Sequence, residues 1–133
     1  LNMASEILVN DGGAPARILP FEAGEAIVAG EPVQVHTDGT VIDTTANFMM
    51  TGIALTAAAD GAICNVVTGS GIIVRALCDQ DASPGDYLNV AAGSLSGTAN
   101  ANTHDDAGSH PVGVCLEQGD GSSGSQLLKV LMK

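Results

Sequence analysis

One short stretch of the chain gathers side chains that could ligate a metal. The sequence THDDAGSH at 103–110 holds His104, Asp105, Asp106 and His110. Imidazole nitrogens and carboxylate oxygens are common ligands of zinc and manganese. A metal site, however, needs ligands that rigid elements and further hydrogen bonds hold in place, and the flanking residues here are small and polar. We therefore predict a solvated loop with no bound metal, with metal binding by these four residues as the alternative.

Two further features suggest catalysis at first sight. The glycine-rich TGSG at 68–71 could cradle a phosphate, but a P-loop continues with Lys and Ser/Thr, whereas this turn continues with Ile72 and Ile73. Cys78 could be a nucleophile, but no histidine base lies near it in the sequence. We predict a hairpin turn at 68–71, a buried Cys78, no cofactor and no enzymatic activity.

The composition excludes several classes of partner. The 133 residues carry a formal charge of −11, and only 14% of them are charged, against a usual figure of about 25%. The four basic residues are scattered along the chain: Arg17, Arg75, Lys129 and Lys133. Nucleic acids and anionic membranes require clustered positive charge, so we expect neither as a partner. A surface so poor in charge instead suggests that part of it meets another protein.

The cysteines and the hydropathy pattern bear on the compartment. Three cysteines, Cys64, Cys78 and Cys115, form no even disulfide framework, which favours synthesis in a reducing cytoplasm. No signal-peptide pattern opens the sequence, and no apolar run is long enough to span a membrane.

Short alternating segments separated by glycine and proline predict an all-β fold. These segments are 32–36, 62–67, 71–78, 111–117 and 126–133. We predict a small β-barrel or β-tulip-like domain of short strands, with at most one or two short helical turns. One such turn is expected at LTAAADG (55–61), where Thr56 could cap it and Gly61 could end it.

Parts of the sequence resemble each other. The stretch at 29–41 resembles 84–95, because each has a glycine-acid pair, a strand, a glycine turn and a return strand. TGIAL at 51–55 similarly recurs as VGVCL at 112–116. A duplication would explain both likenesses, but we favour independent hairpins that follow the same turn chemistry.

The first residues differ from the rest. Residues 1–20 contain an apolar burst followed by a Gly-Gly-Ala-Pro hinge, so we predict an extended N-terminal arm, and a single β-rich domain at 21–133. An ordinary first strand is the alternative. Further on, Phe48, Met49 and Met50 are consecutive apolar residues that one face of a strand cannot hide, so we predict a subunit interface there, with a strand buried on both faces as the alternative.

The order of these features resembles a known family. An arm, AGEPVQVHTDGTV (29–41), GIALTAAADG (52–61) and TGSGIIVRAL (68–77) follow one another. This order is similar to that in the lambda-type head decoration (cement) proteins of tailed bacteriophages, and the likeness is looser after Cys78. The resemblance implies a β-rich homotrimer on the outer surface of the virion, which binds the major capsid protein and clamps neighbouring subunits.

The resemblance also assigns a role to the arm. In this family the arm pairs with a capsid-protein segment by strand addition. Mapped onto this chain, Ile7, Leu8 and Val9 would form the contact strand, while Pro15 and Pro20 would keep the arm extended. The alternatives are a metal- or ligand-binding β-barrel module and another virion component, such as a tail or fibre module.

Overall fold

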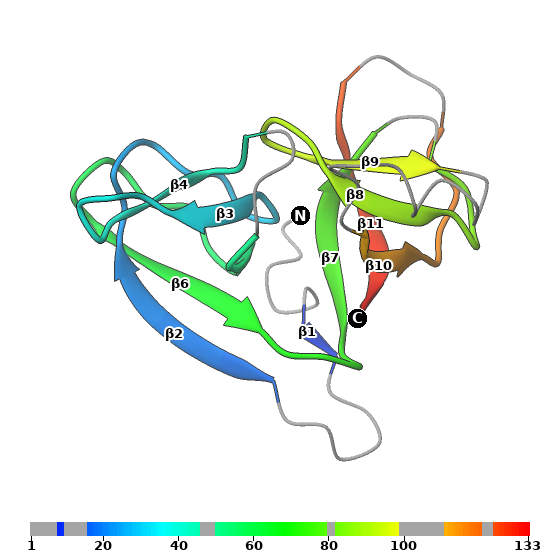
Figure 1. The fold of residues 1–133 in the computed structure, drawn as a ribbon, viewed down its shortest axis with the longest axis horizontal. Coiled ribbons are helices and arrows are strands. Elements are labelled where there is room, and N and C mark those ends of the chain that lie inside the picture. Colours follow the sequence, from blue (N-terminus) through cyan, green and yellow to red (C-terminus); the bar gives the residue numbers. More distant parts are fainter. Residues whose placement is uncertain (1–7, 10–15, 46–49, 80–81, 99–110, 121–123) are drawn as a thin grey trace.

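The computed structural model describes residues 8–9, 16–45, 50–79, 82–98, 111–120 and 124–133. These residues form two lobes that lie side by side (Figure 1). The strands are β1 (Leu8–Val9), β2 (Arg17–Glu22), β3 (Pro32–Val35), β4 (Val41–Asp43), β5 (Gly52–Ala54), β6 (Ile63–Thr68), β7 (Ile73–Cys78), β8 (Tyr87–Val90), β9 (Leu95–Thr98), β10 (Pro111–Cys115) and β11 (Gln126–Met132). None of the described residues is helical, so no helix among them has the length and apolarity of a membrane span. The predicted all-β class is confirmed.

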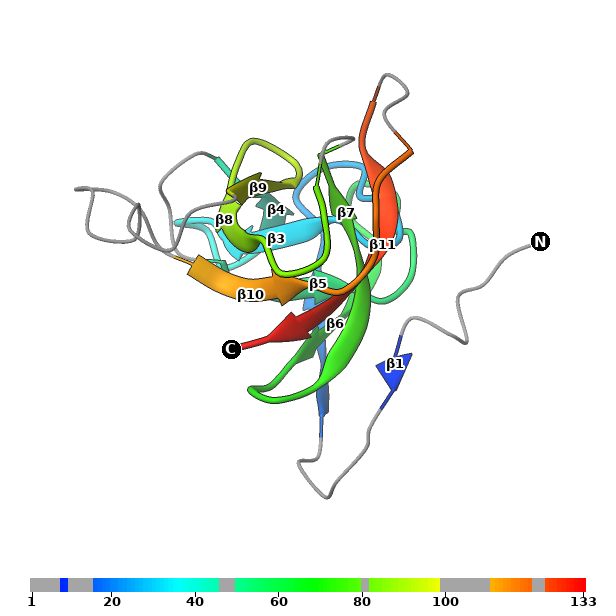
Figure 2. The ribbon, with the colours of Figure 1, turned by 90° about the vertical axis from the view of Figure 1, so that its right-hand side faces the viewer.

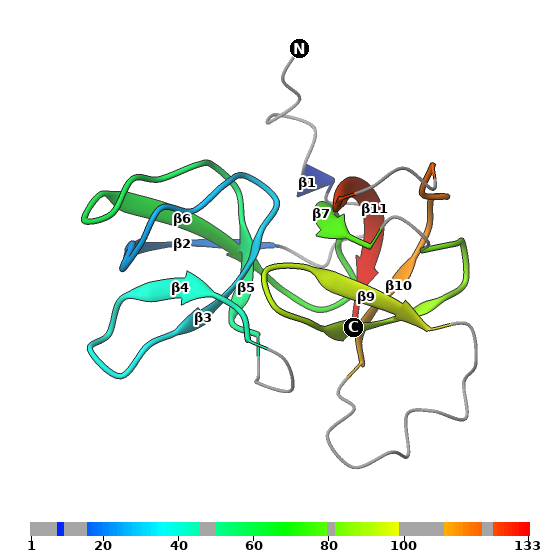
Figure 3. The same ribbon diagram turned by 90° about the horizontal axis from the view of Figure 1, so that it is seen from above.

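The strands form where the sequence alternates. In β7 the side chains of Val74, Ala76 and Cys78 are buried while their neighbours are half-exposed. The same alternation runs through β11, as predicted from the period of two. β5 is the exception, because all three of its residues are buried. Figure 3 shows the reason: β5 belongs to the lobe formed by β2–β6 and lies on the side of that lobe that faces the lobe formed by β7–β11.

The two lobes repeat one topology. The first lobe is a sheet in the order β2-β6-β5-β3-β4, and the second has the order β7-β11-β10-β8-β9, with β1 added outside β7. In each lobe the first and last strands meet at one parallel bridge, Ala23 to Val41 and Cys78 to Leu95. The neighbouring strand pairs are antiparallel. Because one bridge rather than a ladder joins the two edges, each sheet is curled without closing into a barrel.

Register fixes the correspondence residue by residue. Each pair of residues that lie opposite each other in the first lobe has an equivalent pair in the second lobe. Ile53–Val67 is equivalent to Val114–Leu131, Ala54–Val66 to Cys115–Val130, Val33–Gly52 to Leu88–Gly113, and Val35–Val41 to Val90–Leu95. Backbone hydrogen bonds recur in the same way. The bond from Gly30 N–H to Ala54 O is equivalent to that from Gly85 N–H to Cys115 O, and the bond from Gly24 N–H to Val41 O is equivalent to that from Asp79 N–H to Leu95 O. A whole five-stranded unit therefore recurs, and our preference for independent hairpins is wrong. We call 17–68 the first repeat and 72–132 the second repeat.

Two apolar cores fill the repeats. The smaller core lies inside the first repeat and comprises Ala23, Ile27, Val33, Val41, Ala54, Ala58, Cys64 and Val66, with Phe21 packed against it. The larger core fills the second repeat and extends between the two; it comprises Ile53, Val67, Ile72, Val74, Ala76, Cys78, Ala82, Leu88, Leu95, Cys115, Leu128, Val130 and Met132. Successive residues of β6 thus face different cores, since Val66 belongs to the smaller and Val67 to the larger.

The predicted helical turn at 55–61 does not form. Ala58 instead makes an isolated antiparallel bridge with Ile27, with backbone N–H···O distances of 2.8 and 2.9 Å. Gly61 then turns the chain with a φ of 85°. The alanines favour a helix only weakly, and the bridge satisfies backbone groups while burying Ala58 in the smaller core.

Candidate functional site

The predicted contact strand of the arm lies at the edge of a sheet. Leu8 and Val9 form β1, which pairs antiparallel with Val74 and Ile73 of β7. Figure 2 shows β1 beside β7. β1 is the terminal strand of its sheet, and no strand of the described part of the chain pairs with its other edge. Ile7 and Pro15, the other arm residues we singled out before β2, lie outside the described residues.

The last residues assigned to the arm belong to β2. Pro20 pairs with Asn65 of β6, and Arg17–Glu22 pairs with β6 along its whole length. β2 is an edge strand, and Ile18 and Leu19 are 47% and 39% exposed. Proline is tolerated here because an edge position does not require its missing N–H. Ile18 and Leu19 were not predicted as exposed residues of an edge strand, although the sequence ILPF, with its internal proline, is a signal for an apolar edge strand.

Of the predicted subunit interface, only Met50 is described, because Phe48 and Met49 lie outside the described residues. Met50 is half-buried and packs against the larger core. It also lines a shallow groove of about 730 Å³. The groove is lined by Gln34, Val35, His36, Thr37, Ile42, Thr45, Met50 and Thr51. A subunit contact at these residues stays a prediction.

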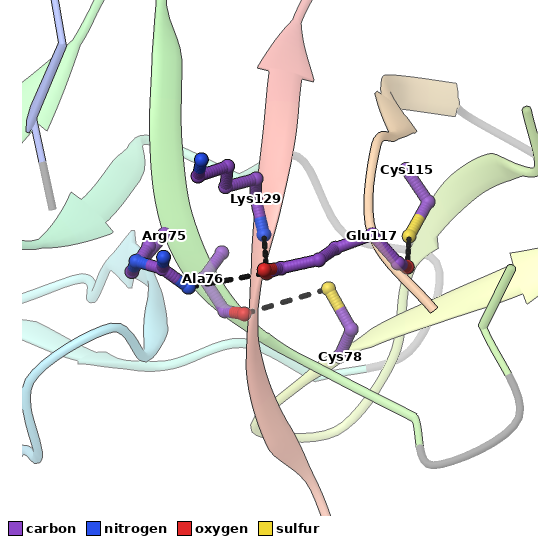
Figure 4. Close-up of polar contacts among 6 residues, drawn as sticks. All are labelled: Arg75, Ala76, Cys78, Cys115, Glu117 and Lys129. Atoms are coloured by element: carbon purple, nitrogen blue, oxygen red, sulfur yellow. Dashed lines mark hydrogen bonds and ion pairs between the residues drawn. The ribbon is translucent and has the colours of Figure 1, made fainter. Parts of the chain in front are cut away.

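The cysteines are structural rather than nucleophilic. Cys64, Cys78 and Cys115 are each 0% exposed, which confirms the predicted burial of Cys78. Burial in the apolar core, followed by the nearby Cys115 and acidic groups, raises the pKa of Cys78 to about 12. Its thiol donates to the carbonyl of Ala76 at 3.5 Å, and that of Cys115 donates to the carbonyl of Glu117 at 2.9 Å (Figure 4). At neutral pH Cys78 is therefore a protonated thiol without access to solvent.

A polar contact ties the strands of the second repeat together. Glu117 Oε1 lies 3.1 Å from Arg75 Nη1 and accepts the backbone N–H of Lys129 at 2.9 Å (Figure 4). One carboxylate thereby joins β7, β11 and the segment after β10. The arrangement anchors the segment that follows Cys115.

Acidic side chains gather where the repeats meet. Asp43 donates its backbone N–H to Glu25 Oε1 at 3.2 Å, and burial together with Glu25 raises the pKa of the Asp43 carboxyl. Burial, opposed by the Val28 N–H, also raises the pKa of Glu31. In the described part of the chain, no group of three His, Cys, Asp or Glu residues is arranged to hold a metal. The candidates His104, Asp105, Asp106 and His110 lie outside that part, so metal binding by them is untested.

The geometry defines an all-β protein with two repeats, open edge strands and exposed apolar side chains. No family model matches the chain, and no curated protein sequence matches it. Among solved structures, the chain is similar to the N base of the head fiber gp8.5 of bacteriophage phi29. The TM-score is 0.65 at 15% sequence identity, over 90% of this chain and 95% of that one. At this identity the likeness establishes a shared fold.

Proposed function

We propose that the chain is a structural protein of a tailed-phage virion, without catalytic activity or a cofactor. It binds the outer surface of the capsid and stabilises the shell by clamping neighbouring major capsid protein subunits, as a homotrimer. The observation that carries this proposal is the fold, which over 90% of the chain matches the base of a phage head fiber. The order of sequence motifs, which resembles that of the head decoration proteins, supports it independently.

The edge position of β1 suggests how the arm would bind. Leu8–Val9 is already in strand conformation, and none of the strands that the structure describes occupies its outer edge. An extended capsid segment adding to that edge would gain backbone hydrogen bonds without any rearrangement of the core. Several arms on one oligomer would then act together, because the first contact raises the effective concentration of the others.

Deletion of residues 1–15 tests this proposal. It removes β1 and leaves β2, whose pairing with β6 is needed for the first repeat. We expect a folded protein whose occupancy on capsids falls by at least about tenfold, the loss expected when a main binding contact is removed. Occupancy is measured by cosedimentation with capsids that lack the protein.

A matched pair of arm variants separates strand pairing from composition. Leu8→Pro with Val9→Pro removes two backbone donors, whereas Leu8→Ile with Val9→Ile keeps the strand and its apolar character. The proline pair should lose occupancy and the isoleucine pair should keep it. Wild-type occupancy after the deletion, or equal occupancy of the two pairs, would show that the arm is not the contact.

A fibre base is the second candidate, because the matched structure is the base of a head fiber. Both candidates require binding to the capsid, but only a clamp must strengthen the shell. Heating DNA-filled capsids with and without the protein, and following DNA release with a fluorescent dye, distinguishes them. A clamp raises the release temperature, whereas a fibre base binds and leaves it unchanged.

A further inference from the structure

The contact between the two repeats joins two unlike surfaces. On the first repeat it uses the outer face of β5 and β6, where Ile53, Leu55 and Val67 point away from that repeat's own core. Ile53 and Val67 are 0% and 1% exposed, although they lie outside the core of their repeat. We call this surface the outer face.

On the second repeat the contact uses one end of the sheet interior. Ile72, Val74 and Met132 are at most 5% exposed and belong to the same core as Ile53 and Val67. They lie at the end of β7 and β11 farthest from the bridge between Cys78 and Leu95. We call this surface the open end, because the outer face of the first repeat covers it.

Since the topology repeats, each repeat has both surfaces, and one of each is left without a partner among the residues that the structure describes. The outer face of the second repeat consists of Val114, Leu116 and Leu131, which correspond to Ile53, Leu55 and Val67. The open end of the first repeat consists of Arg17, Leu19 and Thr68, which correspond to Ile72, Val74 and Met132. Leu116 is 40% exposed and Leu19 39%, whereas Val74, the equivalent of Leu19, is 1% exposed.

The backbone at the edge of β2 agrees with this correspondence. In the contact within the chain, Leu77 of β7 donates its N–H to the carbonyl of Gly30 at 2.8 Å. Glu22 of β2 is the equivalent of Leu77, and Gly85 of the second repeat is the equivalent of Gly30. Ala23 donates its N–H toward β6, to Ala62 O, so the N–H of Glu22 faces the open side of β2.

We propose that the outer face of the second repeat covers the open end of the first repeat on another copy of this chain. The contact joins unlike surfaces, so it is head-to-tail and closes as a ring when the rotation permits. A homotrimer joined in this way is a ring of six repeats. The inference concerns the oligomer alone, and it holds or fails independently of binding to a capsid.

The contact between copies is more polar than the one within the chain. Arg17 and Thr68 stand where the second repeat has Ile72 and Met132. This difference fits a contact that forms between separately folded chains, since surfaces that are exposed before assembly carry more polar groups than a permanent core.

Single substitutions on each surface test the proposal. Leu19→Lys alters the open end and Leu116→Lys alters the outer face, and both positions are exposed enough for the chain to fold. Each variant should weaken self-association by roughly tenfold or more, as expected when a buried leucine anchor is replaced by a charge. Val28→Lys, at a position that is 52% exposed and on neither surface, is the matched control. Light scattering gives the molar mass, and circular dichroism confirms the fold.

Mixing the two variants tests whether the contact is head-to-tail. A Leu19→Lys chain keeps an intact outer face, and a Leu116→Lys chain keeps an intact open end. Each variant alone should be monomeric, while an equimolar mixture should form a complex of two chains through the one intact contact. A monomeric wild-type protein, undiminished association of either variant, or a mixture that stays monomeric would overturn the proposal.

Discussion

Replacing Gly52 with alanine tests the repeat at its tightest point. A Cβ at Gly52 would lie 2.5 Å from the carbonyl oxygen of Val67 and 2.7 Å from Cγ1 of Val66. At the equivalent position of the second repeat, a Cβ at Gly113 would lie 2.6 Å from the carbonyl oxygen of Leu131 and 2.9 Å from Cγ1 of Val130. Ordinary van der Waals contact begins near 3.4 Å, so the added methyl group must push the paired strands apart.

The expected loss of stability follows from two opposing effects. Overpacking costs about 1–3 kcal/mol, and the upper end applies because a backbone carbonyl cannot rotate away. Alanine also restricts the unfolded chain, which offsets about 0.4–1 kcal/mol of that cost. We therefore expect Gly52→Ala and Gly113→Ala each to lower the unfolding free energy by about 2 kcal/mol and the Tm by about 6–10 °C.

Urea unfolding, followed by far-UV circular dichroism, measures these losses. Gly39→Ala is the control, because Gly39 has a φ of 87° and nothing lies within 4 Å of an added Cβ. Alanine at position 39 is strained only by the left-handed backbone conformation, which lowers the unfolding free energy by a net amount of about 0.5–1 kcal/mol. The packing argument would be refuted if Gly52→Ala lost no more unfolding free energy than Gly39→Ala, or if the losses of Gly52→Ala and Gly113→Ala clearly differed.

Two further predictions concern titratable groups. Because the pKa of Asp43 is raised, the folded state binds the proton more tightly than the unfolded state, so stability is greatest below the unfolded pKa and falls as pH rises through the folded pKa. Asp43→Asn should therefore be more stable than the wild type at pH 7, and its urea midpoint should change less between pH 7 and pH 4. A midpoint that changes with pH as much as that of the wild type would contradict this. Cys78, with a pKa of about 12 and no exposed surface, should react with a thiol reagent only on unfolding, so its rate should rise with urea in step with the unfolded fraction, and prompt labelling in the native state would contradict its burial.

The strands were predictable wherever one face is buried. Alternation in β7 and β11 gave their boundaries closely, because each has one face on the larger core. β2 was harder, since Pro20 and its exposed neighbours are typical both of an arm and of an edge strand. Pairing with β6, which no local pattern reveals, decides between the two.

The repeat leaves visible but weak traces in the sequence. Its two halves agree in turn glycines and in the acidic residue that follows Gly30 and Gly85. At core positions they agree only in being apolar, as with Val33 and Leu88, because many side chains can fill the same volume. The two exposed surfaces that we propose to join copies were not predictable, since each is recognised only through its covered equivalent in the other repeat.

The proposed function requires the chain to bind the outside of a phage capsid. The most direct measurement is the cosedimentation of the purified chain with phage capsids prepared without this protein, over increasing amounts of chain. The proposed function predicts saturation at a fixed ratio of bound chains to major capsid protein subunits. Chain that stays in the supernatant, or binding that rises without saturating, would contradict it.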